Sequence, residues 1–431
     1  MRTNSVTLSN LIERDQACIW HPFTQQKTAR PPIPLTHGRG AYLFSSDGEA
    51  YLDAISSWWV NLHGHAHPYI AERLAAQLPL LDQASFADFT HESAVQLAER
   101  LLRMVPGDYR RVFYSDNGST AYETALKMAL QYRHNKGEVQ CRRIVCLRDG
   151  YHGDTFGSMS SCGKHAFNRP FWNYLFQIEQ IDPPYAGCEE KSLNQLRTLL
   201  EAGDVSCFVF EPLLLGVAGM KIYPPAGLDA LLALCRAHDV VTIADEVLTG
   251  FGRTGPLFAT GFLEEQPDIL CLAKGLTGGV LSLGATLCRE KIFEAFLSDE
   301  RSKALLHGHT YTGNPLACTA ALANLDLLDR SECDEQRATI TTAHRGFVAR
   351  WKNHPRLTRC ESLGTALALD YAAGATSYFN SMRDRLYTHF IEKKIYLRPF
   401  GNTLHILPPY CISVEDLERI YAEIIYTLDN L

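Results

Sequence analysis

The stretches that decide the fold are Val240-Val-Thr-Ile-Ala-Asp-Glu246 and Asp268-Ile-Leu-Cys-Leu-Ala-Lys274, two short apolar runs that end in charged residues. Runs of this length and composition are typical of strands that are buried on both faces of a parallel sheet. Similar runs lie near residues 111, 142, 207 and 283, and stretches with helical character separate them. This alternation predicts an α/β fold whose large sheet is mostly parallel and is covered by helices.

The chain after about residue 330 follows a different pattern. Strand-like runs over residues 364–370, 395–401 and 403–409 surround an amphipathic stretch over 377–394. Ser413 then opens a terminal helix with Asp416 three residues later, which is the spacing of a capping box. We therefore predict a large domain over residues 61–330 and a smaller α+β domain over residues 331–431. We expect residues 1–60 to pack on the smaller domain or on a partner subunit.

Composition excludes several classes of protein. The chain has 431 residues and a net charge of −7, which argues against nucleic-acid binding because phosphate recognition needs a basic surface. It has neither an apolar run long enough to span a membrane nor the apolar region of a signal peptide. Its 13 cysteines lie mostly in apolar runs without a CxxC motif. We therefore predict buried, reduced thiols, a cytoplasmic location and no metal site.

Two motifs match known patterns but lack the required context. Gly250–Gly255 fits GxGxxG, yet it does not directly follow a strand, and Pro256 comes next, which argues against a dinucleotide-dependent oxidoreductase. His63, His65 and His67 alternate as metal ligands on a strand would. The proline that follows them suits the first turn of a helix, so we expect loop histidines that make ordinary hydrogen bonds.

Four features lie where predicted strands end, which is where open α/β sheets bind ligands. Asp245 and Lys274 each close a strand, and poor solvation of the lysine lowers its pKa. Gly118 and Ser119 lie at the start of a predicted helix, whose N-terminus favours a phosphate. Tyr151 follows another strand among glycines. Each feature alone has a second interpretation, namely a helix cap, a surface lysine or an ordinary buried ring.

Together the four features describe one ligand. The lysine amine suits an aldehyde, the helix N-terminus suits a phosphate, the tyrosine suits a flat ring, and the aspartate suits a basic ring nitrogen. Pyridoxal 5′-phosphate carries all four groups. A carboxylate beside its ring nitrogen keeps that nitrogen protonated, so that the ring accepts electrons from the substrate. The sequence thus predicts an enzyme that depends on this cofactor.

The same residues point to a known family. Asp245–Gly255 followed by Cys271-Leu-Ala-Lys274-Gly-Leu-Thr-Gly-Gly279 resembles the class III pyridoxal-phosphate aminotransferases, which have fold type I. Further motifs are similar to the branch of that family that makes 7,8-diaminopelargonate for biotin: Trp20–Thr24 (WHPFT), Ser56–Trp59 (SSWW), Gly150–Phe156, Thr310–Pro315 and Leu397–Gly401. The resemblance runs from about residue 20 to residue 409. It implies amino transfer to a keto acid, 7-keto-8-aminopelargonate, in a homodimer with shared active sites.

The resemblance also implies a role for each residue in cofactor binding. Lys274 would bind the cofactor aldehyde covalently and move the proton between substrate and cofactor. Asp245 would hold the ring nitrogen and Tyr151 would stack on the ring. Gly118 and Ser119 would bind the phosphate.

Other residues are implied by the resemblance to bind substrate or to complete the site. Thr310 would reach the phosphate from the other subunit, and Gly308 near it would contact substrate. Trp58 would wall the substrate tunnel and Asp154 would lie near the amine end of the substrate. Arg398 would pair with the far carboxylate of the keto acid, as suits a planar bidentate donor.

Three positions depart from the family pattern. Phe23 stands where this branch often has Tyr, and His405 stands where a Tyr that contacts the amino donor is expected. Because lost hydroxyls in a binding pocket change which ligands it satisfies, S-adenosylmethionine and lysine both stay open as donors. Leu215 stands where the family usually has Gln near the ring oxygen. The alternative function is another class III aminotransferase that acts on ω-amino acids or diamines.

Overall fold

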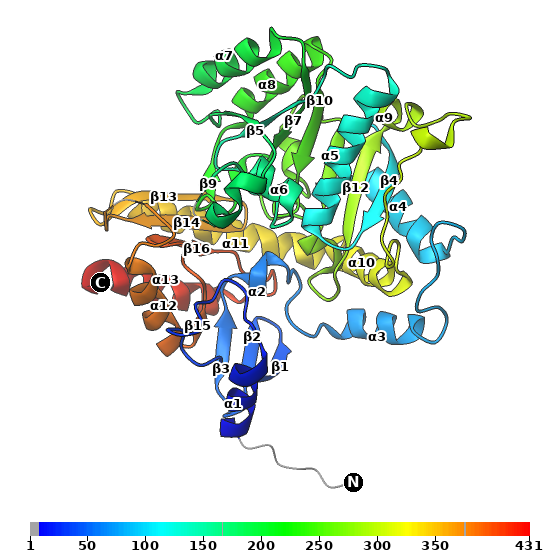
Figure 1. Cartoon of the computed structure of the whole chain (residues 1–431). Coiled ribbons are helices and arrows are strands. Elements are labelled where there is room, and N and C mark those ends of the chain that lie inside the picture. The colour runs from blue at the N-terminus through cyan, green and yellow to red at the C-terminus, as the bar shows by residue number, and fades with distance from the viewer. Residues whose placement is uncertain (1–7, 166, 375) are drawn as a thin grey trace.

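The computed structural model describes residues 8–165, 167–374 and 376–431, and its largest sheet, which has seven strands, lies in the upper half of the view in Figure 1. Strand β12 is antiparallel to both of its neighbours, and the other adjacent strands pair in parallel. The strands, in sheet order, are β4 (Tyr109–Ser115), β12 (Gly284–Arg289), β11 (Ile269–Leu272), β10 (Val241–Asp245), β7 (Val205–Phe210), β5 (Arg143–Leu147) and β6 (Glu179–Ile181). The predicted mostly parallel sheet is therefore confirmed, including each apolar run that predicted a strand.

Both faces of this sheet are buried, because successive side chains of a strand point to opposite faces. In β7, Cys207 and Val209 belong to a core cluster shared with helix α5 (Gly118–Asn135), whereas Phe208 and Phe210 belong to a second cluster on the other side. The second cluster includes side chains of α4 (Glu92–Met104), α7 (Glu189–Leu200) and α8 (Pro225–Ala237). Burial on both faces explains why these strands read as continuous apolar runs.

Smaller elements connect the strands of the large sheet. Leu214 and Leu215 form β8, which pairs with β9 (Lys221–Ile222) in a hairpin. The remaining short helices are α2 (Ser56–Trp59), α6 (Phe156–Ser161), α9 (Glu290–Glu294), η1 (Arg169–Tyr174), η2 (Ala259–Phe262), η3 (Lys274–Thr277) and η4 (Arg301–Lys303). Helix α3 (Pro68–Gln77) has Pro68 in its first turn, as predicted. It packs against α10 (Pro315–Leu328), a helix that is buried on almost all sides.

The C-terminal part of the chain forms a three-stranded antiparallel sheet with its own helices. Its strands and helices are β13 (Leu357–Leu363), β14 (Ala366–Tyr371), β16 (Thr403–Ile406), α11 (Ser331–Trp351), α12 (Met382–Glu392) and α13 (Val414–Asn430). The Ser413 Oγ accepts a hydrogen bond from the Asp416 backbone N–H at 3.0 Å, so the serine half of the predicted capping box is present. This part has the predicted α+β character.

The N-terminal segment pairs with the C-terminal part through a four-stranded sheet. After α1 (Leu8–Cys18), this sheet contains β1 (Leu35–Arg39), β2 (Tyr42–Ser45), β3 (Ala50–Asp53) and β15 (Ile395–Tyr396). Strand β15 lies parallel to β3, although the two are far apart in sequence (Figure 1). The division into units at residues 60 and 330 stays a prediction.

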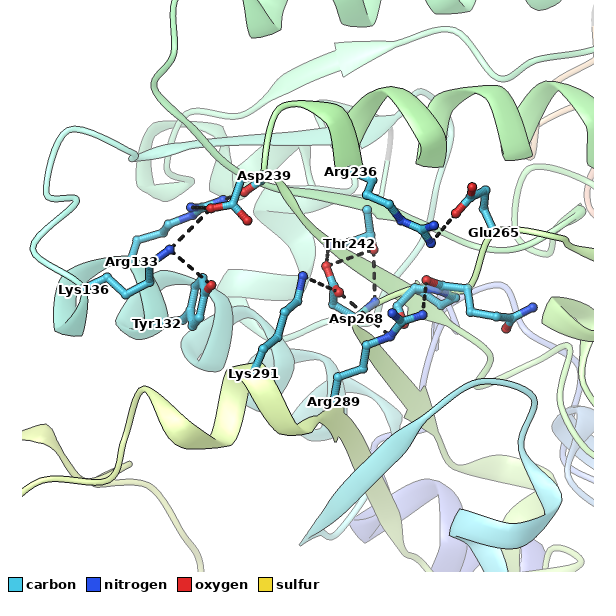
Figure 2. A network of polar contacts seen from close by, with 12 residues as sticks. Tyr132, Arg133, Lys136, Arg236, Asp239, Thr242, Glu265, Asp268, Arg289 and Lys291 are labelled. Atoms are coloured by element: carbon cyan, nitrogen blue, oxygen red, sulfur yellow. Dashed lines mark hydrogen bonds and ion pairs between the residues drawn. The ribbon is translucent and has the colours of Figure 1, made fainter.

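The edge of the large sheet where β10 and β11 begin is closed by polar contacts (Figure 2). Asp268 precedes β11 and accepts a hydrogen bond from the Thr242 backbone N–H at 3.1 Å, and it forms an ion pair with Lys291 at 2.7 Å. The ion pair between Arg236 and Glu265 lies nearby. These contacts satisfy the buried carboxylate, so this edge has a structural role. The opposite edge carries Asp245 and Lys274.

Two further predictions concern the whole chain. All thirteen cysteines are free and most are buried, which confirms the predicted buried thiols. Within the described ranges, we find no helix with the length and apolar character that crossing a bilayer requires.

Candidate active site

A cavity of about 370 Å³ opens at the edge of the large sheet where the parallel strands end. Its wall contains ten of the residues that the sequence singled out: Phe23, Trp58, Gly118, Ser119, Tyr151, Asp154, Asp245, Lys274, Arg398 and His405. They come from both ends of the chain and from four strand ends. The structure therefore brings most of the predicted site together, while the roles of these residues stay predictions.

Lys274 follows β11 directly and begins the short helix η3. Its side chain is only partly buried because it lines the cavity, and its Nζ lies 4.6 Å from the centre of the Trp59 ring. Burial of the amine lowers the pKa of Lys274 to about 8, although Asp245 and Glu211 favour its charged form. A substantial fraction of this amine is thus neutral near pH 8, as attack on an aldehyde requires.

Asp245 is the last residue of β10 and is almost fully buried. One carboxylate oxygen accepts the Val247 N–H at 3.0 Å, and the other lies 2.7 Å from Nδ1 of His152. The His152 ring stacks on Tyr122 at 4.6 Å, so both rings are fixed. Sequence reasoning missed His152, although it directly follows Tyr151 in the motif. The arrangement holds one carboxylate in place at the cavity wall.

The N-terminus of α5 forms another part of the wall. Asn117 and Thr120 make a complete capping box, which fixes the first turn and leaves Gly118 and Ser119 at the cavity. A Cβ at Gly118 would lie 2.7 Å from the Val247 side chain, and a Cβ at Gly153 would overlap Ser119. Only glycine lets these segments approach so closely. Free N–H groups at this helix terminus suit a phosphate.

Glu211 is a second residue that sequence reasoning missed. Its carboxylate lines the cavity, accepting the Tyr151 N–H at 2.8 Å and the Gly216 N–H at 3.0 Å. Burial raises the pKa of Glu211 to about 7, and nearby Asp245 adds to the shift. Burial also raises the pKa of the Tyr151 hydroxyl, with a contribution from Asp154. The sequence feature that could have identified Glu211 is its position directly after the strand run CFVF, since Asp245 was identified by the same kind of position.

The raised pKa of Glu211 predicts how stability depends on pH. Between about pH 4.5, the ordinary carboxyl value, and pH 7, the folded chain holds a proton that the unfolded chain releases. The Glu211 contribution to the free energy of unfolding therefore falls as the pH rises through this window, by on the order of 3 kcal/mol. Denaturant unfolding of the wild type and Glu211→Gln at pH 5 and pH 8 measures the difference. Equal pH dependence in both proteins would contradict the shift.

The outer part of the cavity is aromatic and carries one cation. The Phe23 and Trp58 rings lie 5.6 Å apart, and the Arg398 guanidinium lies 5.1 Å from the centre of the Trp58 ring. Arg398 also donates a hydrogen bond to the Phe23 carbonyl at 3.1 Å. The guanidinium thus lies at the cavity, as the prediction that it binds a carboxylate requires.

His405 is buried, and burial lowers its pKa to about 3, so its ring is neutral at physiological pH. The indole N–H of Trp59 donates to its Nε2 at 3.1 Å, which places the ring proton on Nδ1. Leu215 differs from expectation: it is fully buried in β8 and does not line the cavity. Its side chain faces the core because the β8–β9 hairpin packs there.

Gly308 and Thr310 do not line the cavity of this chain. Both are exposed in the loop before α10, where the Thr310 carbonyl accepts a hydrogen bond from Gln83. Their predicted roles, which involve a second subunit, stay predictions.

The structure shows the local geometry of the two motifs that lack the required sequence context. The segment 250–255 forms turns after β10 and opens no α-helix, since the next element is the short 3-10 helix η2 at Ala259–Phe262, so it has no dinucleotide-binding geometry. His65 is bonded to Asp53 at 2.9 Å. Across residues 8–165, 167–374 and 376–431, no group of three or more His, Cys, Asp or Glu side chains is placed to hold a metal ion.

Comparisons with known proteins agree with this geometry. The family model described as aminotransferase class-III matches residues 23–428. The adenosylmethionine-8-amino-7-oxononanoate aminotransferase of Synechococcus elongatus is 42% identical over 96% of this chain and 99% of its own length. The protein of the same name from Geobacter sulfurreducens is 35% identical over 95% of both chains.

Solved structures show the same fold. The crystal structure of adenosylmethionine-8-amino-7-oxononanoate aminotransferase from Methanocaldococcus jannaschii has a TM-score of 0.91 and 34% identity, covering 98% of this chain and 100% of its own. An amine transaminase from an uncultivated Pseudomonas species, in a PLP-bound form, has a TM-score of 0.87 and 29% identity over 94% and 97% of the two chains. The predicted fold type I is confirmed, and the chain belongs to the class-III aminotransferase family.

Proposed function

We propose that this chain is a pyridoxal-phosphate-dependent aminotransferase that converts 8-amino-7-oxononanoate (7-keto-8-aminopelargonate) to 7,8-diaminopelargonate in biotin synthesis. The names of its relatives support this substrate, and similarity extends over almost the whole chain. The observation that carries the proposal is that Lys274, with a lowered pKa, and the buried carboxylate of Asp245 line one cavity.

The described residues fit pyridoxal phosphate. The cavity has an amine for the aldehyde, a carboxylate for the ring nitrogen, and a helix N-terminus for the phosphate. Glycines let the chain pack closely there, since added Cβ atoms on Gly118 and Gly153 would meet the side chains of Val247 and Ser119. When bound, this cofactor supplies a ring that withdraws electrons and makes the hydrogen beside an attached amine acidic. Lys274 would then accept and return that proton at its Nζ, and the Asp245 carboxylate would hold the ring nitrogen.

The outer cavity supports recognition of the keto acid. Trp58 and Phe23 provide apolar surface for a hydrocarbon chain, and Arg398 provides a planar donor for a terminal carboxylate. We propose S-adenosylmethionine as the amino donor because it is part of the relatives' name. Phe23 lacks a hydroxyl, and His405 is a neutral ring. These two residues keep lysine as the second candidate donor.

The same proposal includes a cytoplasmic homodimer. The free cysteines are consistent with a reducing compartment. Gly308 and Thr310 are exposed on this chain, together with the large apolar side chains of Leu306 and Tyr311. An exposed apolar loop beside residues of the predicted site suits contact with a second copy of the chain.

Single-turnover absorbance spectra test the proposed function. The purified holoenzyme receives S-adenosylmethionine or lysine as the sole amino donor, and the productive donor is expected to remove the visible absorbance of the bound cofactor. Adding 8-amino-7-oxononanoate should then restore it. A spectrum that the keto acid does not change would contradict the assigned substrate.

Replacing Arg398 tests recognition of the keto acid. Arg398→Ala is expected to raise the KM for 8-amino-7-oxononanoate by about 10- to 100-fold with a smaller change in kcat, because it removes a charged hydrogen-bonding partner. Steady-state kinetics at a saturating donor concentration measure this, and Arg398→Lys should recover only part of the loss. An unchanged KM would instead favour an aminotransferase for ω-amino acids or diamines.

A further inference from the structure

The turn formed by residues 56–59 has an unusual backbone. Ser56, Ser57 and Trp59 have φ angles of 53°, 59° and 66°, a region that residues other than glycine seldom adopt. Ser57, with ψ at −92°, lies near the geometry of a classic γ-turn, which is rare and strained. Such a backbone persists only when its surroundings hold it in place.

This turn carries two indole rings that face the two cations of the cavity. The Trp59 ring lies 4.6 Å from Nζ of Lys274, and its N–H donates to His405 at 3.1 Å. The Trp58 ring lies 5.1 Å from the Arg398 guanidinium. The conformation of one turn therefore sets contacts at both ends of the site.

Asp53 is one of the residues that hold the turn, together with the Leu407 carbonyl, which accepts a hydrogen bond from Ser56 Oγ at 2.8 Å. Asp53 is fully buried at the end of β3 and does not line the cavity. One carboxylate oxygen accepts the Ile55 N–H at 3.2 Å, and the other accepts the Ser57 N–H at 2.6 Å and contacts Nε2 of His65 at 2.9 Å. Its own N–H donates to the Ala41 carbonyl at 2.8 Å, so its backbone is fixed by the N-terminal sheet.

We propose that Asp53 is a positioning residue of the active site, whose carboxylate keeps the strained turn closed and thereby places Trp59 against Lys274 and Trp58 against Arg398. The roles of Lys274 and Arg398 in this statement rest on the proposed function. The placement of the turn by Asp53 does not depend on the proposed function. An asparagine at position 53 has one oxygen acceptor, so its NH2 group would face either the Ile55 N–H or both the Ser57 N–H and the His65 ring, which share one oxygen of Asp53. It therefore cannot keep all three contacts.

Fluorescence quenching of the apoprotein tests the placement without substrate or cofactor. Full-length chains carrying Trp20→Phe, which removes a highly exposed indole, are titrated with acrylamide with and without Asp53→Asn. Trp59 is 4% exposed, so release of the turn is expected to raise the quenching constant clearly. In the holoenzyme, Asp53→Asn should raise the KM for the keto acid about tenfold and also lower kcat, because both indoles move.

Asp268→Asn is the matched control. Asp268 is likewise a buried aspartate that accepts a backbone N–H, but it lies at the opposite edge of the large sheet (Figure 2). This variant should lower the melting temperature and leave the quenching constant and the KM unchanged. If Asp53→Asn lowers only the melting temperature in the same way, the proposal is overturned.

His65→Gln is the second test variant and is used if Asp53→Asn does not yield folded protein. It removes the ring contact with Asp53 and leaves both backbone contacts in place, so a smaller increase in quenching and KM is expected. Unchanged values in folded His65→Gln would also overturn the proposal. Failure of the wild type to use the keto acid would count against the proposed function alone, since the quenching result does not depend on the substrate.

Discussion

Lys274→Ala is expected to abolish amino transfer, with a fall in kcat of at least about 10³-fold, because one side chain supplies two functions. Its amine provides the covalent attachment for the cofactor aldehyde, and it also moves the proton that amino transfer requires. Among the described residues that line the cavity, Lys274 is the only lysine. Its pKa of about 8 makes the neutral, reactive form available at little cost.

Stopped-flow absorbance and steady-state kinetics measure this loss. Lys221→Ala is a suitable control, because Lys221 lies in β9 outside the cavity and pairs with Asp149 on the surface side. The control should turn over normally, and both variants should keep the wild-type far-ultraviolet circular dichroism. Turnover by folded Lys274→Ala within tenfold of the wild type would remove Lys274 from its assigned role.

Asp245→Asn is expected to lower kcat by on the order of 10³-fold, because it removes a fixed negative charge from the position of the ring nitrogen. An amide of the same size still fills the space and can still accept a hydrogen bond from His152, although its NH2 group then faces the Val247 N–H. The loss therefore reports the charge and this one backbone contact rather than packing. The KM for each substrate should change much less than kcat.

Glu246→Gln is the matched control, because Glu246 is the neighbouring buried acid and its hydrogen bonds hold the fold rather than the cavity. Glu246 accepts hydrogen bonds from Thr249, Ala259 and Thr260 and does not line the cavity. The Glu246→Gln variant should have a lower melting temperature than the wild type and a nearly unchanged kcat. Equal loss of kcat in the two variants would show that the effect of Asp245→Asn comes from the fold of this segment.

Much of the fold could be predicted because strand and helix patterns are local. The runs that ended at Asp245 and Lys274 are strands β10 and β11, and the segment after Gly118 is helix α5. The expected strand over residues 395–401 is shorter, with only Ile395 and Tyr396 in β15. Pro399 explains part of this, because it has no N–H for a ladder.

The candidate site was predicted less completely, since several of its contacts join distant residues. Leu215 faces the core instead of the cavity. His152 and Glu211 line the cavity, although the sequence analysis did not identify them. Asp53 was also missed, because its role depends on a strained turn that no periodicity reveals.

By itself, the sequence determined the order of strands and helices and the reactive groups at the strand ends, because residue type and spacing are properties of a single segment. Only the tertiary structure decided how those groups behave. The hydrogen bond between Trp59 and His405 joins residues that are 346 positions apart in the chain. The pKa values of Lys274 and Glu211 depend on burial by several other segments of the folded chain. Burial sets the cost of a charge, and burial exists only after the chain has folded.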